Sequence, residues 1–325
     1  MPRSSSRSRP YLMSVSLTAL LLLAACGRTP QELPGAATEP AAAVRQLAMH
    51  LRNNDLAGYA RAAVPPAQYV ALETAWAQGH SRWPLSDLPL DEKLPALLAA
   101  LSEKNAEQQL RRAFKAQLEG QAASVRQAAH SLELFGVQYI THQGDYSPAQ
   151  RAHYVQLVAA LSGWAQAAPL SDPTLAQSAI TTLTTAARAT GLDSVQAFQQ
   201  AGMTASLQRL GPFAAALKQV LASYGLRLDD SIDQLRTGLV TQQGEQATVR
   251  VQYPLAGTEL DLQVMLVRRD GHWYPAQTLA EVDALLAAAQ AAEQARVQEA
   301  AAAAPSVPET AAQDGGDNAG TAAKP

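Results

Sequence analysis

The sequence predicts a predominantly α-helical α+β protein, in which a helical bundle is followed by a small C-terminal antiparallel β-meander. Apolar residues make up 47% of the 325 residues and aromatic residues only 5%, and alanine, the best helix former, supplies much of the apolar share. These residues recur with the helical period of 3.6 as far as residue 225. From Leu235 on they recur with the period of two that is typical of strands.

Residues 1–25 have the pattern of a secretory signal peptide. Arg3, Arg7 and Arg9 form a positively charged segment, and the apolar residues 12–23 follow it. This apolar run is shorter than the roughly 20 residues that a helix needs to cross a bilayer. We therefore expect the segment to be a cleaved signal and not a transmembrane helix.

The end of this segment, Leu-Ala-Ala followed by Cys26, resembles the lipobox of bacterial lipoproteins. The alternative is an ordinary signal that contains a cysteine, but Cys26 is the only cysteine in the sequence. The resemblance implies a diacylglyceryl thioether on Cys26, cleavage before it and acylation of the new amino terminus, so the lipid bilayer is the first expected partner. Gly27 stands where many inner-membrane lipoproteins carry Asp. The family's sorting rule therefore favours the outer membrane of the cell envelope, with the protein facing the periplasm.

The charge of the chain restricts its partners. Removal of residues 1–25 takes away three arginines and no acids, which leaves 22 basic and 28 acidic residues and a net charge of −6. Nucleic-acid binding, which needs a basic stripe, is not expected. The same balance predicts no polybasic patch for anionic lipids. With Cys26 committed to lipid, no internal disulfide can form, and the core must come from packing alone.

Residues 26–40 contain Pro, Gly and small polar residues without periodicity, which is typical of a flexible tether. Residues 41–225 are expected to form a helical region. Asn54 and Asp55 mark a break between its first two helices, and three prolines interrupt the helical pattern between residues 79 and 95. The helices expected in its first half cover residues 41–63 with this break, residues 68–78, and a stretch from Leu94 that continues after Asn105.

Two helix starts in the second half are marked by an N-cap residue followed by proline, at Ser147-Pro148 and at Asp172-Pro173. Gly191 is expected to end the second of these helices. Further helices are expected over residues 125–140, 193–201 and 212–224, with a short strand over residues 137–140 as the alternative for that part.

Residues 226–280 are expected to form the meander of about four strands. Apolar and polar residues alternate over residues 247–253 and 260–266, and turn signals lie at Gly244, at residues 254–257 and at residues 269–271. A sheet of this size needs a cover on one face, so the helices must pack on it. An Ala-rich helix is expected over residues 281–304 and a disordered tail over residues 305–325.

Two stretches are similar to the nuclear transport factor two-like cone fold. Residues 266–274 (LVRRDGHWY) resemble its closing strands, and residues 50–59 (HLRNNDLAGY) resemble its first helix pair. The helical residues between them depart from that family, in which a compact sheet should continue. The resemblance therefore implies a binding or scaffold role at most, because this fold carries many functions.

The motifs of serine hydrolases, zinc proteases, P-loop proteins and thiol oxidoreductases are absent from the sequence, so neither a catalytic residue nor a cofactor is predicted. His142, Asp145 and His153 form the one weak candidate set for a metal. The preferred interpretation places Asp145 near a helix N-terminus and both histidines in solvent. Asp229, Asp230 and Asp233 lack the glycine of a calcium loop and indicate the start of a helix.

Trp76, His80, Arg82 and Trp83 are the candidate ligand-binding residues. Two indoles beside an irregular segment suit stacking on a sugar ring or a peptide, and Arg82 suits binding of a carboxylate. Peptidoglycan offers both chemistries. The alternative, which we favour, is that both tryptophans hold this segment on the core.

The sequence thus favours a non-enzymatic lipoprotein that binds an envelope protein or peptidoglycan. An envelope hydrolase or metal-dependent enzyme is the alternative, and a small-molecule carrier with a pocket between helices and sheet is a third possibility.

Overall fold

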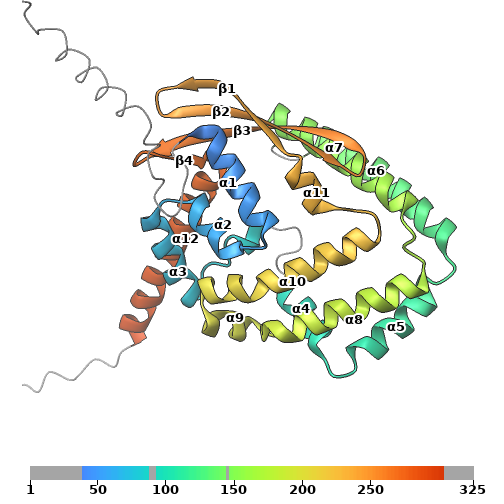
Figure 1. The fold of residues 1–325 in the computed structure, drawn as a ribbon. Coiled ribbons are helices and arrows are strands. Elements are labelled where there is room, and N and C mark those ends of the chain that lie inside the picture. Colours follow the sequence, from blue (N-terminus) through green and yellow to red (C-terminus); the bar gives the residue numbers. More distant parts are fainter. Residues whose placement is uncertain (1–38, 88–92, 144–145, 304–325) are drawn as a thin grey trace, which may run out of the picture.

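The computed structural model describes residues 39–87, 93–143 and 146–303. Cys26, the predicted signal peptide, most of the predicted tether, Asp145 and the predicted C-terminal tail lie outside the described residues. The described part is mostly helical and carries one four-stranded antiparallel sheet near its C-terminal end, which confirms the predicted fold class (Figure 1). None of its helices is long and apolar enough to cross a membrane.

The elements follow one another in a simple order. The helices are α1 (Pro40–Arg52), α2 (Leu56–Ala63), α3 (Pro66–Ala77), α4 (Leu94–Ser102), α5 (Ala106–Gln117), α6 (Ala122–His142), α7 (Pro148–Ala167), α8 (Pro173–Thr190), α9 (Val195–Ala201), α10 (Met203–Ser223), α11 (Leu228–Asp233) and α12 (Ala276–Ala303), with a short 3-10 helix at Leu85–Asp87. The strands are β1 (Arg236–Gln243), β2 (Gln246–Leu255), β3 (Thr258–Arg269) and β4 (His272–Pro275).

Local capping fixes the predicted helix starts. Ser147 and Gln150 form a reciprocal capping box at the start of α7, with each side chain bound to the other residue's backbone N–H. The carboxylate of Asp172 accepts hydrogen bonds from the backbone of Thr174 and Leu175 at 2.8 and 2.9 Å. Gly191 ends α8 with a φ of 61°, the left-handed conformation that glycine adopts without strain.

Residues 125–140 are helical as expected and lie inside α6, so the alternative strand over residues 137–140 does not form. Two predicted boundaries are wrong. Helix α12 begins at Ala276 and not at residue 281. Helix α10 begins at Met203 and contains Pro212, which was expected to start the helix. The buried face of α10 runs on both sides of this proline, from Leu207 to Val220, and burial of that face offsets the roughly 3 kcal/mol that an internal proline costs.

The four strands pair in sequence order, β1-β2-β3-β4. Strand β1 is an outer strand, with most of its residues exposed, and its pairing with β2 shifts by one residue between Leu239 and Thr241. Strand β4 pairs only with the last four residues of β3, from Leu266 to Arg269. The first part of β3 therefore has β2 on one side and no strand on the other.

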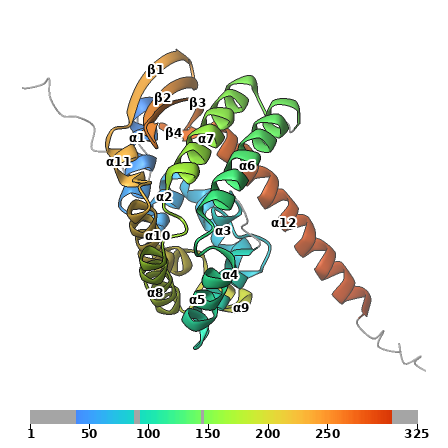
Figure 2. The ribbon, with the colours of Figure 1, turned by 90° about the vertical axis from the view of Figure 1, so that its right-hand side faces the viewer.

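The core has a helical part and two parts at the sheet. The largest cluster packs α2, α3, α4, α8 and α10 around Trp76, Leu98 and Leu207, and α12 joins it through Leu279 and Val282. At the sheet, α1 packs on Val249, Val251 and Trp273, and α7 packs on Leu255 and Leu260. Both views place the sheet at one end of the body and α5 at the other (Figures 1 and 2).

Candidate ligand-binding site

The end of α3 places the predicted binding residues. Gly79 follows this helix with a φ of 79°, and the backbone N–H of His80 donates to the carbonyl of Ala75 at 2.8 Å. A Cβ atom on residue 79 would lie 2.4 Å from Nε2 of Gln199, so a larger residue would clash as well as strain the backbone. Glycine thus allows the segment after α3 to turn and lie close to α9.

The two tryptophans of the predicted site are buried. Trp76 and Trp83 are each 1% exposed. The indole Nε1 of Trp76 donates to the carbonyl of Phe198 in α9 at 2.9 Å, and the two rings lie 6.4 Å apart. Neither indole offers a free face to a sugar, so the stacking interpretation is wrong for this structure. Their burial agrees with the alternative, in which both rings hold the irregular segment on the core.

The other predicted residues lie at the edge of a pocket. A hollow of about 480 Å³ lies between the segment after α3, helix α9 and helix α12. It is lined by Trp76, Gly79, His80, Ser81, Arg82, Ser86, Val195, Phe198, Gln199 and Leu285. Trp76, His80 and Arg82 thus share one pocket, whereas Trp83 packs beneath it. We call this hollow the α3–α9 pocket.

The α3–α9 pocket combines apolar and polar groups. Phe198, Val195 and Leu285 supply apolar surface, and imidazole, hydroxyl, amide and guanidinium groups line the rest. Nε2 of His80 lies 3.8 Å from a carboxylate oxygen of Glu293 in α12. Hydrogen bonds from Arg296 lower the pKa of Glu293, which keeps this carboxylate ionised beside the imidazole. A few polar groups around an apolar surface are typical of sites that bind small molecules or short segments.

Sequence reasoning missed the contributions of α9 and α12 to this pocket. Phe198, Gln199, Leu285 and Glu293 are more than 100 residues away from Trp76 in the sequence. They carry no local motif, because their role arises only when three distant elements pack together.

The weak metal candidates are not assembled by the described residues. His142 is exposed at the end of α6, and Asp145 lies outside the described residues. His153 is only 6% exposed, so the prediction of a solvated side chain is wrong for this residue. Within residues 39–87, 93–143 and 146–303, no three His, Cys, Asp or Glu side chains come close enough to hold a metal ion.

His153 instead joins α7 to the unpaired edge of β3. Its Nδ1 lies 3.1 Å from the backbone carbonyl of Asp261, and its Nε2 lies 3.4 Å from the hydroxyl of Tyr253. The side chain of Gln156 accepts a hydrogen bond from the backbone N–H of Asp261 at 3.1 Å. Side chains of α7 thus satisfy the peptide groups that a neighbouring strand would otherwise bind.

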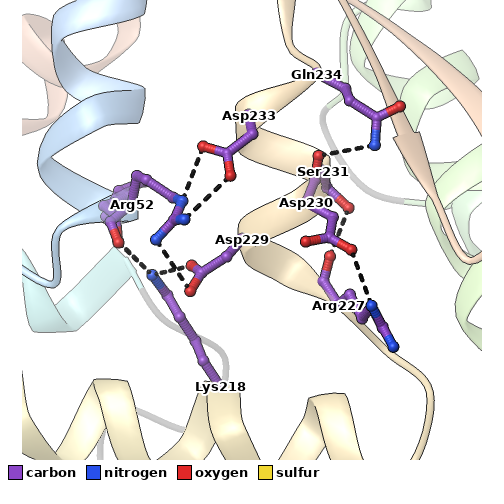
Figure 3. Close-up of polar contacts among 9 residues, drawn as sticks. Arg52, Lys218, Arg227, Asp229, Asp230, Ser231, Asp233 and Gln234 are labelled. Atoms are coloured by element: carbon purple, nitrogen blue, oxygen red, sulfur yellow. Dashed lines mark hydrogen bonds and ion pairs between the residues drawn. The ribbon is translucent and has the colours of Figure 1, made fainter.

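The acidic cluster forms α11, as predicted, and cations neutralise it (Figure 3). Arg52 of α1 binds both carboxylate oxygens of Asp233, at 2.9 and 3.0 Å, and this pairing lowers the pKa of Asp233. Nζ of Lys218 in α10 lies 2.7 Å from a carboxylate oxygen of Asp229. Figure 3 shows Arg52 reaching both Asp233 and Asp229 from α1, and Lys218 reaching Asp229 from α10. The cluster therefore joins three helices, which explains it without a bound ion.

A second hollow, of about 640 Å³, is lined mainly by cations on and beside α5. Its lining residues are Lys104, Asn105, Glu107, Gln108, Arg111, Arg112, Lys115 and Arg188. We call this surface the α5 stripe. These cations come together despite the net negative charge of the chain, which did not indicate a local cluster.

Comparisons of the chain with protein-family models, with curated proteins and with solved structures found no match. The similarity of two stretches to the cone fold therefore stays a prediction.

Proposed function

We propose that this chain is a lipid-anchored protein of the bacterial cell envelope, whose periplasmic part acts by binding and not by catalysis. The observation that carries the proposal is the lipobox pattern at residues 23–26, where the only cysteine of the sequence follows a charged and then an apolar segment.

Acylation of Cys26 would hold the protein at the membrane. Each buried methylene group contributes about 0.8 kcal/mol, and one acyl chain alone binds only marginally. A thioether-linked diacylglycerol together with an acylated amino terminus supplies several chains on one residue, and the anchoring is then effectively permanent. Residues 26–40 reach at most about 50 Å when fully extended, so the folded part stays close to the anchoring membrane.

The α3–α9 pocket supports the binding role. It brings together an apolar surface, the imidazole of His80 and the guanidinium of Arg82. A short segment of an envelope protein or a small envelope component is the ligand class that this mixed lining suits.

Metabolic labelling with an alkyne-tagged fatty acid tests the anchor. We expect the wild-type protein to carry label and to fractionate with membranes, and Cys26→Ser to lose both. A double variant, Cys26→Ser with Gly27→Cys, keeps one cysteine outside the lipobox register and should behave like Cys26→Ser. An unlabelled wild-type protein with a free Cys26 thiol would refute the proposal.

Crosslinking in intact cells tests the binding role. A photoreactive amino acid in place of His80, at the edge of the α3–α9 pocket, should give a defined adduct with an envelope component. The same group in place of Arg126, an exposed residue of α6, is the control and should give none. Identical crosslinking patterns from both positions would exclude the pocket as the binding site.

A further inference from the structure

The cations of the α5 stripe form a continuous line along one side of a helix. Gln108, Arg111, Arg112 and Lys115 are spaced by three or four residues, so they share one face of α5. Lys104 in the turn before α5 continues this line, and Arg188 reaches it from α8. At 1.5 Å per residue, the line from Lys104 to Lys115 is about 16 Å long.

The charges of the α5 stripe are only partly compensated. Five cations line the hollow together with one carboxylate, that of Glu107. Glu107 lies 3.3 Å from Arg111 and 3.3 Å from Arg188, and Arg188 also donates to the carbonyl of Glu103 at 2.9 Å. Glu107 therefore orders two of the arginines.

The remaining three cations have no such partner. Within the part of the chain that the structure describes, Lys104, Arg112 and Lys115 make no side-chain hydrogen bond or ion pair. Two guanidinium groups held by Glu107 thus lie beside three cations that are available to an anionic ligand.

The residues that line the hollow of the α5 stripe narrow the class of ligand that can bind there. All eight lining residues are polar or charged, so the hollow offers no pocket for the aromatic or aliphatic anchors that dominate protein–protein interfaces. A polyanion that binds through its charged groups alone is the ligand that this lining fits.

The polyanion that the α5 stripe can reach depends on where the stripe lies relative to the proposed anchor. Helix α1, which follows the proposed tether, packs on the sheet, and α5 lies at the opposite end of the body in both views (Figures 1 and 2). An anchor at Cys26 joins the membrane to the α1 end. The α5 stripe then lies at the end of the folded part that is remote from this attachment point, where it is accessible to a polymer in the periplasm.

We propose that the α5 stripe binds the carboxylate-bearing polymer of the cell wall, peptidoglycan, with successive carboxylates of the polymer paired to Lys104, Arg112 and Lys115. This inference rests on the proposed envelope location. Arg111 and Arg188, held by Glu107, supply the fixed positive field that orients the polymer along the stripe.

Sedimentation with purified insoluble peptidoglycan tests the proposal, with the mature acylated protein kept in a neutral detergent. The triple variant Lys104→Glu/Arg112→Glu/Lys115→Glu should bind at least about tenfold more weakly than wild type. Binding of wild type should also be lost at 1 M salt, where the Debye length is about 3 Å, and with peptidoglycan whose carboxylates have been amidated.

The control variant carries the same change in charge at exposed positions elsewhere, Lys93→Glu/Arg126→Glu/Arg209→Glu, and should bind like wild type. If the first triple variant does not fold, as judged by circular dichroism, the corresponding triple substitution to Gln replaces it and should show the same loss. Equal loss in the control, or binding that survives amidation, would overturn the proposal.

Two further outcomes would also overturn it. Preferential binding to vesicles that contain anionic phospholipid would assign the stripe to a membrane, and recovery of an acidic protein in place of peptidoglycan would assign it to a protein partner. Failure of the anchor is recognised separately, because the mass of the N-terminal peptide shows whether Cys26 is acylated whatever the sedimentation result.

Discussion

The two indoles beside the α3–α9 pocket are equally buried but differ in their polar contacts. Nε1 of Trp76 donates to Phe198 of α9, whereas Nε1 of Trp83 is buried and finds no hydrogen-bond partner among the described residues. A buried polar group without a partner costs free energy, so Trp83 stabilises the fold through packing alone.

This difference predicts unequal effects of the same substitution. Both Trp76→Phe and Trp83→Phe remove part of a fully buried ring, but only the first removes a hydrogen bond. We expect the free energy of unfolding to fall more for Trp76→Phe, by about 1–2 kcal/mol relative to Trp83→Phe. Urea denaturation followed by circular dichroism measures both values, and an equal or larger loss for Trp83→Phe would contradict the assignment.

The burial of the two tryptophans was predictable from the sequence, whereas the burial of His153 was not. Large aromatic side chains are usually buried wherever they lie, so Trp76 and Trp83 could be assigned to the core from residue type alone. The burial of His153 depends on Asp261 and Tyr253, which lie about 100 residues further along the chain. No local pattern around His153 carries that information.

Among the elements, α1, α10 and α11 are joined by polar contacts at their ends. Nζ of Lys218 donates to the carbonyls of Leu51 and Arg52, at 2.6 and 3.2 Å, and lies beside Asp229. The side chain of Lys218 is only 15% exposed. One ammonium group thus binds two carbonyls of the last turn of α1, where a cation is favoured, and a carboxylate of α11.

Lys218→Met should therefore reduce the free energy of unfolding by about 1–3 kcal/mol, because a carboxylate and two carbonyls lose their common donor. Arg227→Met is the matched control. Arg227 is 71% exposed and pairs with the exposed Asp230, so its loss should change stability by less than about 0.5 kcal/mol. Chemical denaturation at neutral pH measures the free energy of unfolding of both variants. Similar losses in the two variants would show that the contacts of Lys218 contribute no more stability than an exposed ion pair does.

Element boundaries were predictable where a local chemical signal fixes them. The N-caps at Ser147 and Asp172 and the glycine after α8 are found as expected. The start of α10 was not predictable, because its continuation through Pro212 depends on a buried face that forms only on folding. The α5 stripe was missed for a related reason. The net charge is a sum over the whole chain and does not show where charges gather. The clustering of cations in the α5 stripe depends on their helical spacing in α5 and on Arg188 from α8.

For the whole molecule, the contact between α7 and the sheet predicts sensitivity to acid. Burial of His153 lowers its pKa below the ordinary value of 6.5, although the hydrogen bond to Asp261 acts in the opposite direction. The groups that face His153 are the hydroxyl of Tyr253, whose pKa is raised by burial, and the carbonyl and carboxylate of Asp261.

As the pH falls below 6.5, the unfolded chain takes up a proton at residue 153 before the folded protein does. The stabilising effect of the neutral imidazole is therefore complete above pH 6.5 and is lost as the pH falls towards the lower pKa of the folded state. This residue should contribute a slope of up to about 1.4 kcal/mol per pH unit. Urea denaturation at pH 7.5 and 5.5 should show a smaller pH dependence for His153→Gln than for wild type. The exposed His142→Gln is the control, and an unchanged slope in His153→Gln would disprove this origin.

The outer position of β1 in the sheet makes the protein prone to aggregate during recombinant expression. Its peptide groups on one side are open, and Leu239 and Val240 are about half exposed beside them. Such an edge is a template on which a second chain can add a strand and begin to aggregate. The shift in pairing between Leu239 and Thr241 bends that edge and limits a matching strand to a short stretch on either side. Overproduction raises the concentration of chains in which this segment is exposed before the sheet has formed, so inclusion bodies seeded by residues 236–243 are the expected failure of recombinant expression.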